Sequence, residues 1–165
     1  MADLLTHVLL AYSLCTCLSW RVDWMTERWV VIGMCGTALP DLIKLSKVVP
    51  THTVETLIGL PFTYVPWGTV GGVVLLAGVI TSFFATDRKR AYAMLLFGGS
   101  SAVVLDGLRA YADGYADFWL YPFLWVRSPT PSLYVSSDPR ILGVALLVAA
   151  GVSGIDRYWI TRDER

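Results

Sequence analysis

The sequence has no excess of charge of either sign, since its 165 residues include 13 basic and 13 acidic side chains. Proteins that bind the phosphate backbone of nucleic acids carry a basic surface, so this balance argues against DNA or RNA as a partner. Cysteine is also scarce, and Cys15, Cys17 and Cys35 form neither a C-x-x-C motif nor a zinc-binding spacing. All three lie in apolar segments, where we interpret them as packing residues.

Apolar residues, in contrast, are abundant. They make up 55% of the chain against 16% charged residues, and they fall in blocks that approach the ~20 residues a helix needs to cross a bilayer. We therefore expect an all-α, polytopic membrane protein that forms one domain over residues 1–165. The expected spans are about 4–20, 29–45, 67–85, 92–108 and 141–160. Asp138 and Pro139 predict the start of the last span, as its N-cap and first helical residue.

Two further apolar stretches are too short or too interrupted to cross a membrane. Residues 54–66 contain Pro61 and Pro66, and residues 118–126 contain Pro122. Proline removes a helical hydrogen bond, and an unpaired backbone group is costly in hydrocarbon. We expect both stretches to be interfacial or re-entrant.

Five spans would place the two termini on opposite sides of a cell membrane. Cytoplasmic loops usually carry the excess of basic residues, and the two sides would receive eight and five of them. This bias predicts that the N-terminus is outside and the C-terminus is cytoplasmic. The larger set is Arg21, Arg28, Arg88, Lys89, Arg90, Arg157, Arg162 and Arg165, and the smaller is Lys44, Lys47, Arg109, Arg127 and Arg140.

The most informative residue is Asp106, a carboxylate near the end of the fourth expected span. A charge at the centre of a lipid-exposed helix costs roughly 2.5–3.5 kcal/mol on insertion scales, so an intramembrane aspartate is a candidate for function. Arg109 lies three residues later on the same helix face, which leaves a private ion pair as the alternative.

Other polar residues are expected at the membrane face of Asp106. His7 lies near the start of the first span, and Asp41 lies near the end of the second. Because successive spans alternate in direction, these residues meet residues 67–69 and the long aromatic connection at 110–139. Imidazole and carboxylate groups are ligands of zinc and similar divalent metals. His7, Asp41 and Asp106 therefore form a candidate metal site.

Several short motifs follow one another along the expected spans. They are Asp3-Leu4-Leu5-Thr6-His7, Leu39-Pro40-Asp41-Leu42, Val54-Glu55 with Gly59-Leu60-Pro61-Phe62, Thr69-Val70-Gly71-Gly72, Leu105-Asp106, Pro129-Thr130-Pro131-Ser132-Leu133-Tyr134 and Ser136-Ser137-Asp138. In this order they resemble the membrane-bound metal-dependent hydrolase family, the LexA-regulated hydrolase-like proteins, and most closely its archaeal members. The resemblance covers nearly the whole chain.

The resemblance implies a divalent metal held near His7, Asp41 and Asp106 by these residues and two further histidines. Such a metal would activate water for hydrolysis of a lipid or another amphiphilic ester or phosphoester. Asp3 would support His7 from one helical turn away.

The chain departs from the family pattern at three positions. Gly68 and Ala102 stand where the two further histidines are expected, and Ile43 stands where the family has an acidic or hydroxyl residue. His52 would replace a lost ligand only if its loop folded back onto the site.

Two functions from different classes follow from these departures. The first is a metal-dependent hydrolase acting on membrane lipid. The alternative is a catalytically inactive membrane scaffold or complex subunit that keeps the fold, with another membrane protein or a second copy as its partner. A small transporter is disfavoured, because the polar residues gather at one face and no inverted repeat is present.

Overall fold

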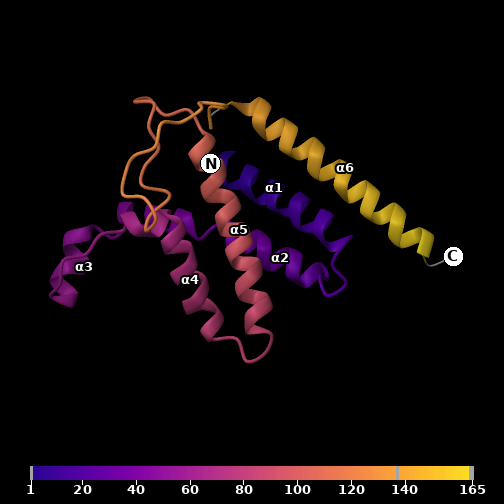
Figure 1. Ribbon diagram of the computed structural model, residues 1–165, viewed down its shortest axis with the longest axis horizontal. Coiled ribbons are helices and arrows are strands. Elements are labelled where there is room, and N and C mark those ends of the chain that lie inside the picture. The colour runs from indigo at the N-terminus through magenta and orange to yellow at the C-terminus, as the bar shows by residue number, and fades with distance from the viewer. Residues whose placement is uncertain (1, 137, 164–165) are drawn as a thin grey trace.

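The chain folds into helices joined by loops (Figure 1). The computed structural model describes residues 2–136 and 138–163, with side chains for 4–136 and 138–159, and no strand occurs among them. The elements are α1 (Ala2–Ser19), α2 (Glu27–Gly36), the 3₁₀ helix η1 (Pro40–Lys47), α3 (Thr51–Ile58), the 3₁₀ helix η2 (Val65–Gly68), α4 (Val70–Ser82), α5 (Arg88–Leu108) and α6 (Pro139–Asp163). The expected all-α class is confirmed.

In the part of the chain that the structure describes, two helices are long and apolar enough to cross a membrane, namely α5 and the Pro139–Trp159 part of α6. The consecutive helices α2 and η1, bent by 45°, add a third crossing if the pair is one span. Among the described residues, α1 and α4 are apolar but too short to pass the same test. The membrane character of the chain is therefore supported, whereas the expected number of about five spans is not confirmed.

The expected spans are shortened or divided for local reasons. The second breaks after α2, because Pro40 lacks the N–H that a continuous helix requires. The third begins at Val70 rather than at 67, because Val65–Gly68 form η2 and Thr69 caps α4. The Thr69 side chain accepts a hydrogen bond from the backbone N–H of Gly72 at 3.1 Å. As expected, neither 54–66 nor 118–126 forms a helix of spanning length.

Glycines bring α2 and α5 close together in the centre of the molecule. A Cβ atom on Gly98 would collide with the carbonyl oxygen of Gly33, and one on Gly36 would lie 2.5 Å from the carbonyl oxygen of Leu95. Such close backbone contact is typical of helices that associate in membranes. It fixes the position of α5, which carries Asp106.

Helix α6 packs alongside α1 and runs in the same direction (Figure 1). Near the ends of the two helices, Nε1 of Trp20 donates a hydrogen bond to Oδ1 of Asp156 at 2.8 Å. Most of the apolar side chains of α6 are exposed, including Val144, Leu147 and Trp159. These side chains present an apolar face to lipid or to a neighbouring protein.

The long connection between α5 and α6 closes over the helix ends. Its backbone carbonyls at Trp119 and Tyr121 accept hydrogen bonds from the first N–H groups of α4, at 2.9 and 2.8 Å. At the end of α5, Ala110 donates to the carbonyl of Tyr134 at 2.7 Å. These bonds satisfy backbone groups that helix termini leave unpaired, and they hold the connection against the face where His7 lies.

Candidate functional site

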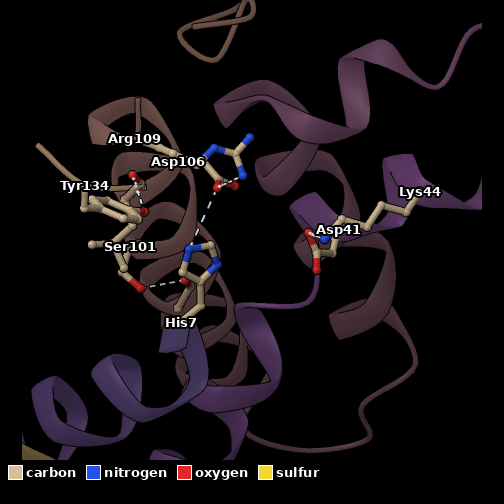
Figure 2. Close-up of polar contacts among 9 residues, drawn as sticks. His7, Asp41, Lys44, Ser101, Asp106, Arg109 and Tyr134 are labelled. Carbon is tan, nitrogen blue, oxygen red and sulfur yellow. Dashed lines mark hydrogen bonds and ion pairs between the residues drawn. The ribbon is translucent and has the colours of Figure 1, made fainter. Parts of the chain in front are cut away.

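His7 lies on α1 and points toward the end of α5 (Figure 2). Its side chain is only 3% exposed, and its Nε2 atom lies 3.8 Å from Oδ1 of Asp106. This distance is too long for a hydrogen bond, and Nε2 has no hydrogen-bond partner among the described residues. The two side chains are thus neighbours, with a buried imidazole nitrogen left unsatisfied between them.

Asp106, in the last turn of α5, also contacts Arg109, the residue that directly follows the helix. Nη1 of Arg109 lies 3.6 Å from Oδ1 of Asp106, and each side chain is about one quarter exposed. The ion pair expected from the spacing is therefore present, and it coexists with the contact to His7. The two interpretations of Asp106 that the sequence left open are not exclusive.

Asp41 belongs to the same cavity but has a different partner. Its carboxylate Oδ1 lies 2.6 Å from Nζ of Lys44, one turn along η1, as Figure 2 shows. Asp41 and Asp106 both line a cavity of about 270 Å³ between η1, η2, the end of α5 and the connection that follows it. The structure thus brings Asp41 and Asp106 to one cavity, whereas His7 contacts Asp106 but is not among the residues that line it.

The positions that depart from the family pattern are apolar in the structure as well. Ile43 and Gly68 both line the cavity, and a Cβ on Gly68 would lie 3.3 Å from Cδ1 of Ile43. Ala102 is completely buried in α5. None of the three supplies a donor atom to a ligand.

The aromatic connection forms the outer wall of the cavity, as expected. The indole of Trp119 covers Gly107, where an added Cβ would lie 3.1 Å from the ring. Its Nε1 atom is buried and has no hydrogen-bond partner among the described residues. Tyr111 lies beside Arg109, and burial raises the pKa of its phenol, while the guanidinium acts in the opposite direction. Sequence reasoning placed the connection here but did not single out Trp119.

The described residues do not fit a metal ion. No group of three His, Cys, Asp or Glu side chains comes together among them. Asp41 and Asp106 already have cations beside them, Lys44 on Asp41 and Arg109 on Asp106. The pairing of Asp41 with Lys44 was missed from the sequence, although their spacing of three residues was readable.

The two weaker candidates do not complete the site. His52 is exposed on α3 and does not line the cavity, so the loop does not fold back as a replacement ligand would require. Asp3 lies outside the residues whose side chains the structure describes, and its supporting role stays a prediction.

No protein-family model, curated protein or solved structure matches the chain.

Proposed function

We propose that the chain is a non-catalytic membrane protein of the hydrolase-like type, a scaffold or complex subunit in which a charge network has replaced the metal. In this proposal it crosses the membrane about five times, with the N-terminus outside and the C-terminus in the cytoplasm. The pairing of Asp41 and Asp106 with cations carries the proposal. A divalent metal needs these carboxylates as ligands, and Lys44 and Arg109 compete with it for them.

The apolar contact inside the cavity supports the same conclusion. A hydrolytic site needs polar groups that hold a metal or activate water, whereas Ile43 lies against Gly68 where such groups are expected. The exposed apolar face of α6 suits a subunit or scaffold, because it provides a surface for lipid or for a neighbouring protein.

Metal-dependent hydrolysis is the second candidate, and one observation favours it. The Nε2 atom of His7 is buried, lies beside Asp106 and has no hydrogen-bond partner among the described residues. An imidazole nitrogen of this kind is a typical metal ligand. The cavity is also large enough for a small polar group of a lipid or ester.

Metal analysis of the purified protein separates the two functions. After incubation with zinc and removal of free metal, we expect far less than one zinc ion per chain, and the same content in His7→Ala and Asp41→Ala. A content of about one ion per chain that both variants lose would establish the hydrolase instead. Assays of ester and phosphodiester hydrolysis on the same samples should give no activity above the buffer.

A gain-of-ligand variant tests the relation to the metal-dependent family. Ile43→Asp combined with Gly68→His places a carboxylate and an imidazole at adjacent positions of the cavity wall. We expect this double variant to bind zinc, and the matched variant Ile43→Asn with Gly68→Ala to bind none. Failure of the double variant to bind zinc, while it remains folded by circular dichroism, would contradict the assignment of these positions to a former metal site.

A further inference from the structure

A second cavity lies at the other end of α1, away from His7. It has a volume of about 570 Å³ and is lined by the end of α1, the start of α2 and Asp156 of α6. In Figure 1 this region is the one where the end of α1 turns into α2 beside α6. It shares no lining residue with the cavity of Asp41 and Asp106.

The polar side of this cavity is acidic. Glu27 and Asp156 both line it, and no lysine or arginine whose side chain the structure describes does so. Neither carboxylate forms an ion pair with a described residue. Oδ1 of Asp156 accepts a hydrogen bond from Trp20, which holds the carboxylate in place and leaves its other oxygen available. The cavity is therefore suited to a cation.

Thr16 is a second and independent indication of a ligand. The residue is 4% exposed and lines the cavity, and its hydroxyl forms no hydrogen bond with another described residue. Its oxygen is not among the fully buried atoms that lack a partner in the described residues, so the hydroxyl is accessible from the cavity. Ser19, in contrast, donates its hydroxyl hydrogen to the carbonyl of Thr16 at 2.7 Å. The hydroxyl of Thr16 is thus available to a molecule in the cavity.

The other side of the cavity is apolar and open. It is formed by Met25, Val30, Val31 and Met34 of the α1–α2 turn and α2. Val30 is buried, whereas Val31 is 55% exposed. A ligand with a polar head at Asp156 can therefore extend an apolar chain along α2.

We propose that this cavity binds the primary ammonium group of an amphiphile, with its hydrocarbon chain along Val31 and Met34. A primary ammonium has three N–H donors, which match the two carboxylates and the hydroxyl of Thr16. A quaternary ammonium has no donor and is bound by aromatic cages, whereas Tyr12 is the single aromatic residue lining this cavity in the described part of the chain. The proposal does not depend on the fate of the metal site.

Calorimetric titration with octylamine, in maltoside detergent at neutral pH, tests the proposal. Octyltrimethylammonium and octanol are the matched probes, because they keep the chain and remove the N–H donors or the charge. We expect octylamine to bind at least about tenfold more tightly than either, as hydrogen bonds to a charged group allow. Equal binding of the three probes to the unmodified protein would overturn the proposal, and this outcome requires no variant to fold.

Variants locate the binding. Glu27→Gln with Asp156→Asn should weaken octylamine binding at least about tenfold, and Thr16→Val should weaken it by a smaller factor. Asp23→Asn is the control, since Asp23 is an exposed carboxylate of the same turn that does not line the cavity. Because the amine partitions into the micelles to the same extent with every variant, a difference in affinity between variants comes from the protein. Unchanged affinity in a folded Glu27→Gln, Asp156→Asn protein would also overturn the proposal.

Two sources of the ammonium group can be distinguished by competition. In nanodiscs that contain phosphatidylethanolamine, octylamine binding is reduced relative to phosphatidylcholine nanodiscs if a phospholipid headgroup fills the site. Equal octylamine binding in the two nanodiscs assigns the site to a free alkylamine.

Discussion

The Nε2 atom of His7 and the Oδ1 atom of Asp106 lie 3.8 Å apart, although 99 positions separate the two residues in the sequence. The same carboxylate oxygen lies 3.6 Å from Nη1 of Arg109. A buried imidazole and a guanidinium thus share one aspartate at the end of α5. The arrangement places two basic side chains beside one carboxylate, and it leaves Nε2 of the imidazole without a hydrogen bond from any described residue.

Replacing Asp106 tests how much this contact stabilises the fold. We expect Asp106→Asn to lower the free energy of unfolding by about 1–2 kcal/mol, because Arg109 loses a charged partner in a partly buried position. The side chains are about one quarter exposed, which keeps the effect below that of a fully buried pair. Thermal or denaturant unfolding in detergent measures the change.

The control for this substitution is Asp23→Asn. Asp23 is exposed and forms no ion pair with a described residue, so its replacement should change the free energy of unfolding by less than about 0.5 kcal/mol. Equal effects of the two substitutions would mean that the contacts of Asp106 add nothing to stability.

Metal removal provides a second prediction. A bound metal stabilises the folded state, by about 2.7 kcal/mol when its concentration is one hundred times the dissociation constant. Because Lys44 and Arg109 lie beside the two carboxylates, we expect a chelator to leave the midpoint of thermal unfolding unchanged. Added zinc should not raise it. A midpoint that falls with the chelator and recovers with zinc would contradict the metal-free proposal.

Much of the helical arrangement could be predicted from the sequence, because it follows from local properties. The lengths of the apolar blocks predicted the approximate positions of the helices. The N-cap expected at Asp138 is confirmed by the hydrogen bond from the N–H of Arg140 to its Oδ1 at 2.9 Å. The structure places Gly33 and Gly36 of α2 against α5.

The number of spans was harder to predict, because it depends on where short local structures divide an apolar block. Pro40 separates α2 from η1, and η2 removes the first residues from the third expected span. Composition alone does not reveal these breaks, since the interrupted segments stay apolar.

The site was predicted in its location but not in its chemistry. Alternating span direction brings Asp41 and Asp106 to one end of the bundle, and this requires only the order of the spans. The partners of these residues depend on side-chain geometry. Trp119 covers the cavity because backbone hydrogen bonds fix the connection on α4, and such long-range bonds have no local signal in the sequence.

Tyr134 connects the cavity wall to α5, and its replacement provides a third prediction. Its hydroxyl donates a hydrogen bond to the carbonyl of Leu105 at 2.8 Å. We expect Tyr134→Phe to lower the free energy of unfolding by about 1 kcal/mol and to speed hydrogen exchange at Ala110, whose N–H is bonded to the Tyr134 carbonyl. Tyr115→Phe is the control, because this side chain is 48% exposed. Faster exchange at Ala110 in both variants would contradict the role of the hydroxyl.

The connection also predicts a local pH dependence at Asp113. Its Oδ2 atom lies 2.7 Å from Nη2 of Arg127, and its Oδ1 accepts a hydrogen bond from the N–H of Tyr115. These contacts hold the pKa of the Asp113 carboxyl below its ordinary value of 3.8, with the bond to Arg127 as the larger cause. A depressed pKa in the folded state means that the contacts stabilise the loop fully above pH 3.8.

This stabilisation is lost as the pH falls through the depressed pKa, so the loop should open below pH 3.8. Hydrogen exchange at Tyr115, corrected for its intrinsic pH dependence, should rise in that range, and Asp113→Asn should remove the pH dependence. Asp117→Asn is the matched control. Oδ1 of Asp117 lies 3.8 Å from the same Nη2 atom of Arg127, so Asp117 interacts with Arg127 more weakly than Asp113 does. An acid response that survives in Asp113→Asn would place the responsible group elsewhere in the connection.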